Sequence, residues 1–417
     1  MESASNKRIL QNLFRFYFAR HPEIKLPLKD IKAVEAITQC NTPDRGYNVL
    51  SCPQGHGEKI QSHSCRHRSC PICADRARFE WIEKEKQRLI DCSHFHVIFT
   101  LPHEYITLWQ YNRQWFTRHL FKACRDTLIE LLEDTRHLGV TPGILMTLHT
   151  WGRQLNYHPH IHCLVTAGGV TKSNDWLSVE GHFLLPIRVV KALYRGKLQD
   201  WINHALQTGE LRLPKQVELK EMLDKHRLLY RKEWSVRIQE KYDHGRGVVL
   251  YLARYMKGGP VKPRQLQVSS QSVTLSYRDH RDKRLKTLKL AMSDFINRIL
   301  WHVPESGIHV VRHYGLYASR NQNQRQSLQS GTPNRETSGM TLKDAVNWCC
   351  ETCGAVMQRT FTTYQRKDYE NSYNKEASAK IVQQDVEDGT LEAGRSPPTA
   401  YLSPKSIFFS LNGVRLT

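Results

Sequence analysis

The segment Asn156-Tyr157-His158-Pro159-His160-Ile161-His162-Cys163-Leu164-Val165 places two histidines on either side of one apolar residue, in a β-like run. Successive side chains of a strand point to opposite faces, so His160 and His162 would lie on the same face of a sheet. Two imidazoles held side by side in this way can bind a divalent metal ion. The pattern therefore predicts a sheet with a metal site on one face.

A second apolar run, residues 144–151, precedes this segment, and the short link through Asn156 and Pro159 predicts a hairpin. His149 lies on the neighbouring strand of that hairpin, so we expect it to be the third ligand. His158 is the alternative, although the predicted turn includes it. A catalytic Mg²⁺ or Mn²⁺ needs open positions for a phosphate, so two or three protein ligands suffice.

The histidine spacing also occurs at His94 and His96, on another predicted strand that ends at Pro102. We interpret that pair as mainly structural or DNA-facing. Further strands are predicted at 272–277, 286–290 and 307–314. Helices are predicted at 105–137, over most of 187–245, and at 248–256 and 292–301.

The predicted helix at 248–256 carries Tyr251 and Tyr255, whose four-residue spacing places both phenols on one face. Alone, this pattern describes an ordinary amphipathic helix. A phenol is a poor nucleophile below its pKa of about 10, but nearby cations and a metal-polarised phosphate favour its attack. Together with the histidines, the two tyrosines indicate a covalent phosphotyrosine route for cutting single-stranded DNA. Arg254 and Lys257 supply positive charge beside them.

The charge of the chain favours a phosphate polymer as its partner. Lys and Arg number 61 against 40 Asp and Glu, which gives a formal charge of +21. No apolar stretch approaches the roughly 20 residues of a spanning helix, and no signal peptide is evident. We therefore expect no membrane association and a reducing, cytoplasmic environment for the eleven cysteines.

Five candidate zinc ligands lie within a short span: Cys52, His56, Cys65, Cys70 and Cys73. Four suffice for a tetrahedral site. Cys70 and Cys73 form a compact knuckle, with Cys52 and His56 as the opposing pair. Cys65 is either the fourth ligand in place of His56 or a neighbour of the site. The basic residues Arg66 and Arg68 between them are expected to contact DNA phosphates.

Other cysteines have no complete ligand set in the sequence. Cys40 could join a second, incomplete site. Cys349, Cys350 and Cys353 form a cluster without a partner pair, for which a structural role and a metal are equally good interpretations.

Several of these motifs resemble one family. His149–Gly152 followed by His158–His162, and then Tyr251–Tyr255, are similar to motifs of the HUH-type Y2 transposases of the IS91 family. The segments Ser64–Cys73, Phe99–Pro102 and Val311–Tyr317 resemble that family as well. The resemblance covers about residues 35 to 320, in order. Cys52-x3-His56 departs from it, because many relatives have C-x2-C there, which leaves the identity of the zinc ligands open.

The resemblance implies an α+β fold: residues 1–91 would hold N-terminal helices and a zinc-binding module, and 92–320 an HUH domain with a central antiparallel sheet and flanking helices. Residues 321–417 would form a polar, partly disordered region. The resemblance also implies rolling-circle-like transposition of a bacterial insertion sequence. One tyrosine would cut, keeping a 5′-phosphotyrosine, and the other would complete strand transfer. Single-stranded DNA at the element ends and target, and the host replication machinery, would be the partners. The implied location is the nucleoid.

Three alternatives remain from the residues alone. A replication initiator or relaxase of the HUH class would use the same histidines, but such proteins generally lack this zinc module. A non-catalytic, zinc-dependent DNA-binding regulator would leave the histidines and tyrosines unexplained. A tyrosine recombinase would need an ordered set of arginines and histidines that the sequence does not show.

Overall fold

The computed structural model describes residues 8–215, 217–242, 259–279, 282–330 and 348–363. The chain divides into two compact units. One comprises residues 1–13 and 66–340, and the other residues 14–65 and 341–417, each as far as it is described. In the described ranges, no helix combines the length and the apolar character needed to cross a membrane.

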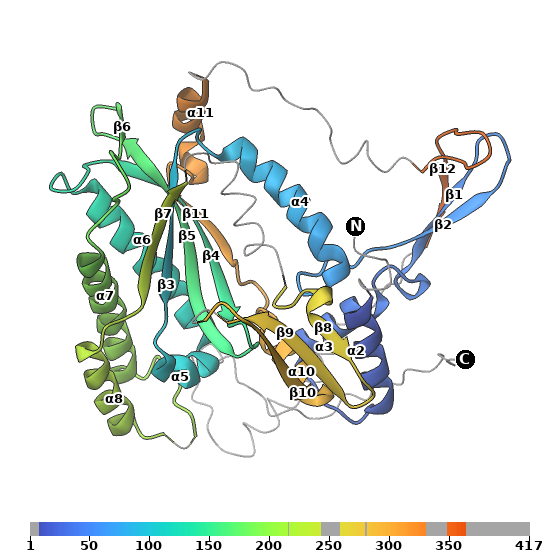
Figure 1. The fold of residues 1–417 in the computed structure, drawn as a ribbon, viewed down its shortest axis with the longest axis horizontal. Helices are drawn as coiled ribbons and strands as arrows, with labels where there is room; N and C mark the ends of the chain where they lie inside the picture. Colours follow the sequence, from blue (N-terminus) through green and yellow to red (C-terminus); the bar gives the residue numbers. More distant parts are fainter. Residues whose placement is uncertain (1–7, 216, 243–258, 280–281, 331–347, 364–417) are drawn as a thin grey trace, which may run out of the picture. The chain divides into compact units, whose positions relative to one another are not determined.

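A six-stranded antiparallel sheet forms the centre of the first unit (Figure 1). Its strands, in the order in which they pair, are β11 (Val311–Gly315), β4 (Thr141–Trp151), β5 (Tyr157–Val170), β3 (His94–Thr100) and β7 (Val236–Tyr242). The short β6 (Trp176–Ser178) pairs with the end of β5. The predicted β4–β5 hairpin and the strand at β3 are confirmed. The prediction of helix over most of 187–245 is wrong at β7, which pairs with β3.

Alternation along these strands separates two faces. Phe95, Val97 and Phe99 of β3 point into the main core, as do Ile161 and Cys163 of β5. Helices cover this face (Figure 1). They are α5 (Ile106–Tyr111), α6 (Arg113–Glu133), α7 (Ile187–Gln207) and α8 (Leu219–Arg231). The intervening residues, including the histidines, therefore occupy the opposite face.

On that opposite face, a smaller apolar cluster covers one end of the sheet. Trp81 and Leu89, in and just after α4 (Pro71–Arg88), pack there against Leu145 and Leu164. His149 and His162 also lie on this face, and both are buried.

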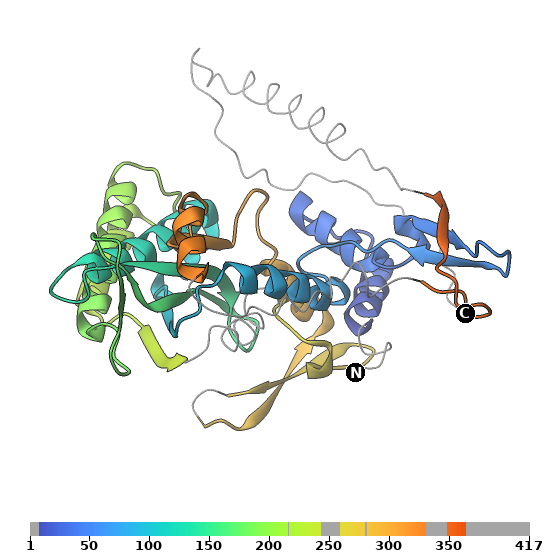
Figure 2. The same ribbon diagram turned by 90° about the horizontal axis from the view of Figure 1, so that it is seen from above.

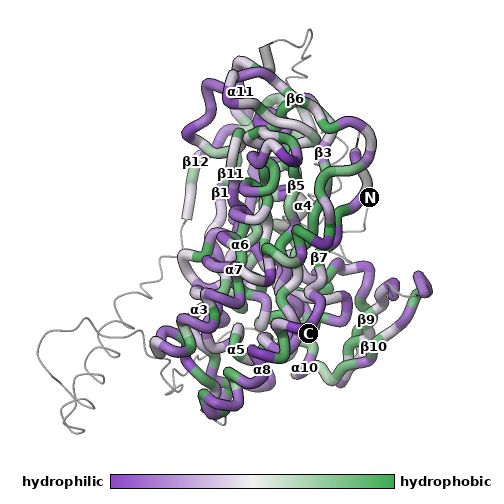
Figure 3. The backbone as a smooth tube through the Cα atoms, turned by 90° about the vertical axis from the view of Figure 1, so that its left-hand side faces the viewer, coloured by the Kyte–Doolittle hydropathy of each residue, from purple (hydrophilic) through white to green (hydrophobic). Residues whose placement is uncertain are grey.

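A second antiparallel sheet of the same unit joins β8 (Leu266–Val268), β9 (Ser272–Arg278) and β10 (Leu285–Ala291). It is followed by α10 (Met292–Trp301), which contacts β9 and β10. Figure 2 shows this ribbon as a separate layer, and Figure 3 shows polar and apolar residues alternating along it. The predicted strand pair and the helix after it are confirmed. They could be predicted because each has a local periodicity of its own.

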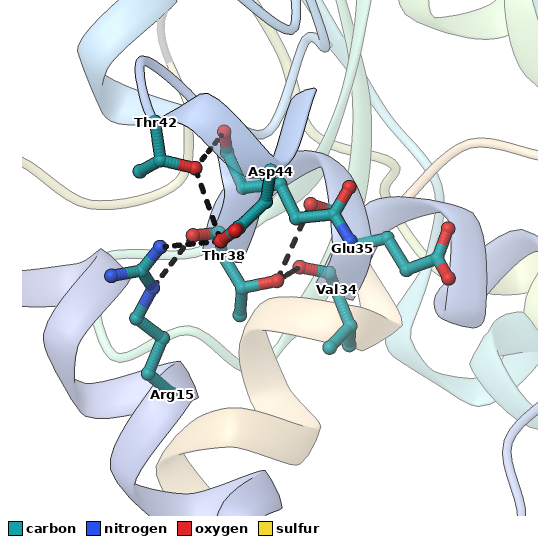
Figure 4. A network of polar contacts seen from close by, with 7 residues as sticks. Arg15, Val34, Glu35, Thr38, Thr42 and Asp44 are labelled. Carbon is teal, nitrogen blue, oxygen red and sulfur yellow. Dashed lines mark hydrogen bonds and ion pairs between the residues drawn. The ribbon is translucent and has the colours of Figure 1, made fainter. Parts of the chain in front are cut away.

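The second unit is built around a small sheet. Strands β12 (Gln358–Thr362), β1 (Tyr47–Ser51) and β2 (Glu58–Ser62) pair in that order. The helices near its start are α2 (Ile9–Arg20) and α3 (Leu28–Gln39). Arg15 connects them: its Nε donates to the Thr38 carbonyl at 2.7 Å, and its guanidinium lies 3.6 Å from the Asp44 carboxylate (Figure 4).

The polar region after residue 320 contains ordered elements where it is described. Helix α11 (Gln322–Ser330) follows β11, and β12 pairs with β1. Residues 331–347 and 364–417 of the region that was predicted to be partly disordered lie outside the described ranges.

Candidate functional site

Three histidines meet on the face of the large sheet that lies opposite the main core. Strands β4 and β5 pair so that His149 lies directly opposite His160, and Thr147 opposite His162. One ring nitrogen from each of the three histidines lies within 4.8 Å of the other two. The ring centroids are 4.6 Å apart for His149 and His162, and 4.8 Å apart for His160 and His162. The structure thus brings together the three residues that the sequence predicted as metal ligands.

Hydrogen bonds determine which nitrogen His160 presents. Its Nδ1 lies 2.6 Å from the carbonyl oxygen of His158. A carbonyl only accepts, so this nitrogen must carry the proton and the Nε2 lone pair must be open. His158 contributes this backbone atom while its own ring is exposed. Of the two candidates for the third ligand, the structure groups His149, not His158, with the pair.

His162 is oriented by a chain of two further side chains. Its Nδ1 lies 2.8 Å from Nε2 of His96, whose Nδ1 lies 2.7 Å from Oε1 of Gln239. The amide oxygen accepts from His96, so His96 accepts from the Nδ1–H of His162. His162 therefore also presents an Nε2 lone pair. Figure 1 shows the adjacent strands β5, β3 and β7 that supply these three residues.

Two lone pairs consequently face each other, because Nε2 of His160 and Nε2 of His162 are 3.0 Å apart. Such an arrangement is repulsive alone and becomes favourable when both nitrogens bind one cation. Adjacent ligands of an octahedral ion at about 2.1 Å are themselves about 3.0 Å apart. The residues present therefore fit a divalent metal.

Burial keeps these imidazoles neutral. It lowers the pKa of His160 to about 3, with the neighbouring His158 as a further cause, and that of His96 to about 4. Burial, followed by the neighbouring histidines, holds the pKa of His162 well below its usual range. At neutral pH these rings need lose no proton before they bind a metal.

Neither Gln239 nor the role of His96 was predicted from the sequence. Gln239 lies on β7, in the stretch expected to be mostly helical, so nothing local connected it with a histidine 143 positions away. His96 sits where the pairing of β3 with β7 shifts register between Phe95 and Val97. Such bulges re-aim side chains, here toward Gln239.

His94 has a purely structural environment. It is fully buried, its Nε2 lies 2.6 Å from the Tyr317 hydroxyl, and its Nδ1 lies 2.8 Å from the Cys92 carbonyl oxygen. Tyr317 ends the segment that begins at β11. The interpretation of His94 as mainly structural agrees with this environment, whereas His96 contacts the metal-site candidate.

The link between β4 and β5 is held from α10 and the residue after it. Nη1 of Arg298 donates to the Gln154 carbonyl oxygen at 2.9 Å. His302 lies 3.1 Å from both the Thr150 hydroxyl and the Leu155 carbonyl oxygen. These contacts stabilise the turn immediately beside the histidines.

The residues proposed for nucleophilic attack and their cationic neighbours, Tyr251, Arg254, Tyr255 and Lys257, lie outside the described residues. Their roles remain predictions from the sequence.

The candidate zinc ligands form two groups, and their membership differs from the predicted set. Cys40, Cys65, Cys70 and Cys73 form the first, and Cys52, His56, Cys350 and Cys353 the second. The prediction that Cys52 and His56 oppose the knuckle of Cys70 and Cys73 is therefore corrected. Cys40 completes the first group. Its contribution could not be recognised from spacing, because 25 residues separate it from Cys65.

The two arginines of the knuckle region differ in accessibility. Arg66 is exposed and has a left-handed φ of 53°. Arg68 is partly buried, and burial lowers its pKa to about 10, which still leaves it charged at neutral pH.

Comparisons with known proteins cover both parts of the chain. Residues 143–325 match a family described as "Putative transposase", and residues 9–101 match the "Transposase zinc-binding domain". A Sinorhizobium fredii protein with the first of these descriptions is 30% identical over 74% of this chain and 79% of its own. The transposase for insertion sequence element IS801 of Pseudomonas savastanoi pv. phaseolicola is 30% identical over 77% of this chain and 78% of its own. No solved structure matches significantly.

The first match includes all three histidines, and the second includes every cysteine of the first group. The chain therefore belongs to the IS91 family of transposases and carries that family's zinc-binding domain.

Proposed function

We propose that this transposase cuts and rejoins single-stranded DNA through a 5′-phosphotyrosine, using an HUH-type site on the face of the large sheet that carries the three histidines. The observation that carries the proposal is the convergence of two lone-pair nitrogens, of His160 and His162, at 3.0 Å, with His149 beside them. A transposase must break phosphodiester bonds in order to move DNA. The histidines of β5 (Tyr157–Val170), together with His149, could bind the metal ion for this step.

The histidines would hold Mg²⁺ or Mn²⁺ as a group of three. When bound, the ion would supply polarisation of the scissile phosphate and orient it for in-line attack. The protein's own contribution is the fixed orientation of the rings: the His158 carbonyl orients His160, and His96 with Gln239 orients His162. Because three nitrogens form the set and Mg²⁺ prefers oxygen, we expect Mn²⁺ to bind more tightly.

Tyr251 or Tyr255 would act as the nucleophile. Its phenolic oxygen forms a bond to phosphorus while the bond to the 3′-oxygen breaks, and the phenolic proton ends on the released 3′-hydroxyl. The number of phosphodiester-type bonds is unchanged, so no ATP is needed. The second tyrosine would take up the strand at the target or the other element end. Arg254 and Lys257 would offset charge on the phosphate.

The first cysteine group would hold a structural zinc ion, with four thiolates from Cys40, Cys65, Cys70 and Cys73. Cys70 precedes α4, and Pro71 begins that helix. Exposed Arg66 and partly buried Arg68, between Cys65 and Cys70 in the sequence, would contact DNA phosphates. Because thiolate ligands require reducing conditions, a cytoplasmic, nucleoid-associated location fits this arrangement.

Covalent capture of DNA tests the proposal. The zinc-loaded protein, incubated with labelled single-stranded DNA from the element ends and Mn²⁺, should form a protein–DNA adduct that survives denaturation. Replacing both Tyr251 and Tyr255 by phenylalanine should abolish the adduct, because no phenolic oxygen remains. Each single substitution should show which phenol cuts first. Denaturing electrophoresis provides the readout.

Tyr277→Phe is a matched control, because this hydroxyl contacts Gln154 in the hairpin link and has no proposed chemical role. The control should form the adduct as the wild type does. If the wild type binds the DNA but never forms an adduct, the chemical step is refuted for these ends, and a DNA-binding regulator becomes the better interpretation.

Removing the acceptor of His162 should weaken metal binding. In His96→Phe, the Nδ1–H of His162 loses its partner and the ring is no longer held in one orientation. Loss of such a supporting residue typically lowers metal affinity roughly 10–100-fold. Titration calorimetry with Mn²⁺ on the zinc-loaded protein measures the change.

His94→Phe provides the matched control for this effect. His94 lies two residues away on the same face of β3 and is equally buried, but it bonds Tyr317. Both substitutions remove a buried hydrogen bond and should lower stability, whereas only His96→Phe should change the Mn²⁺ affinity. Equal affinities in the two variants would exclude a positioning role for His96.

A further inference from the structure

The second cysteine group lies within the unit formed by residues 14–65 and 341–417. Two of its members, Cys52 and His56, follow β1, and the other two, Cys350 and Cys353, precede β12. The "Transposase zinc-binding domain" match ends at residue 101, so half of this group lies outside it.

We propose that Cys52, His56, Cys350 and Cys353 bind a second zinc ion, which attaches the segment 348–363 to the N-terminal module. The proposal does not depend on the phosphotyrosine chemistry above.

The distances within the group fit a tetrahedral ion. Sγ of Cys52 lies 3.6 Å from Sγ of Cys353 and 3.6 Å from Nδ1 of His56. Sulfur ligands at about 2.3 Å from zinc are about 3.8 Å from each other. A disulfide would need about 2.05 Å between the sulfurs, so the pair is not an oxidised bridge. Three thiols with one imidazole form a frequent structural zinc set.

Two tight turns present the four ligands. In the first, the Gly55 amide donates to the Cys52 carbonyl at 2.9 Å, and Gly55 has a φ of 76°. In the second, the Gly354 amide donates to the Cys350 carbonyl at 2.9 Å, and Gly354 has a φ of 70°. The backbone amide of Gln54 also donates to Sγ of Cys52 at 3.4 Å. Both turns therefore have the compact form of a metal-binding knuckle.

The strands beside these turns are paired although some 300 residues separate them. Ser51 of β1 pairs with Gln358 of β12, and Asn48 with Thr362. Lys59 of β2 forms an ion pair at 2.5 Å with Glu351, which lies between Cys350 and Cys353 in the sequence. The pairing places the ends of β1 and β12 where the four ligands meet.

Apolar burial alone is too small to hold this sheet. Its core cluster consists of Leu50, Met357, Cys52 and Cys350, with Cys353 packed against it. Among the described residues, only Leu50 and Met357 of this cluster are large hydrophobic side chains. Ordering the backbone of 348–363 costs conformational entropy at every residue, which the burial of two such side chains does not offset. A metal ion supplies the missing stabilisation, as it does in small domains without a sufficient core.

Metal analysis of the full chain tests this assignment. The wild-type protein should carry two zinc ions, one for each cysteine group, and Cys350→Ser/Cys353→Ser should carry one fewer. Cys349→Ser is the matched control: this thiol is exposed, adjacent in sequence and outside the group, so its zinc content should equal that of the wild type. Plasma mass spectrometry after exhaustive dialysis gives the ratio of zinc to protein.

If Cys350→Ser/Cys353→Ser misfolds, His56→Ala still tests the proposal. The side chain is exposed, so its removal should leave the fold intact. One of the two zinc ions should then pass to a chromophoric chelator much faster than in the wild type. Equal zinc content in the double variant and the wild type, or an unchanged release rate in His56→Ala, would overturn the proposal.

Discussion

Replacing His162 by alanine should reduce metal-dependent strand cleavage about 10³-fold, the equivalent of about 4 kcal/mol of transition-state stabilisation supplied by a bound ion. The substitution removes one of the two nitrogens that face each other at 3.0 Å. It also removes the hydrogen bond between His162 and His96. DNA binding, which depends on the basic surface, should change little. Single-turnover cleavage of labelled single-stranded DNA with Mn²⁺, and fluorescence anisotropy for binding, separate the two effects.

His158→Ala distinguishes the two candidates for the third ligand. The substitution keeps the backbone carbonyl that orients His160 and removes only an exposed ring. We expect cleavage close to that of the wild type in His158→Ala and a large loss in His149→Ala. The reverse order would transfer the third-ligand role to His158. If His162→Ala cleaved as fast as the wild type, the histidine group would not be the catalytic centre.

Gly315→Ala should destabilise the protein by roughly 2–5 kcal/mol, a large part of the 5–15 kcal/mol typical of a folded domain. Gly315 ends β11 with a φ of 56°, in the left-handed region that disfavours a Cβ. A Cβ there would also lie 1.8 Å from the carbonyl oxygen of Pro142, which accepts the Leu316 amide at 2.9 Å. Neither backbone can move without breaking the pairing of β11 with β4.

For Gly196→Ala, in contrast, we expect the protein to become more stable. Gly196 lies inside α7, and no atom lies within 4 Å of where its Cβ would be. Alanine should stabilise the helix there by roughly 0.5–1 kcal/mol. Urea unfolding of the zinc-loaded variants, followed by tryptophan fluorescence, compares the two. Similar unfolding midpoints for both variants would contradict the close approach of β11 and β4.

The elements that the sequence predicted well have local signals. The β4–β5 hairpin, the strand β3, the pair β9 and β10, and the helix α10 each carry their own periodicity or turn residues. The family could also be predicted from the sequence, because its motifs occur in order along the chain. Strand β7 was missed because its backbone state depends on pairing with β3, more than 130 residues earlier.

The sequence by itself determined the histidine pair, the third histidine on the preceding strand, and the presence of a cysteine-based module. Each depends on spacing within one strand, one hairpin or one knuckle, where a few dihedral angles set the distances. Only the tertiary structure decided which cysteines share a group and what orients His162. Cys350 meets Cys52, and Gln239 meets His96, because strands distant in sequence pair side by side. Sequence spacing carries no information about such pairing, since the intervening chain can adopt many paths.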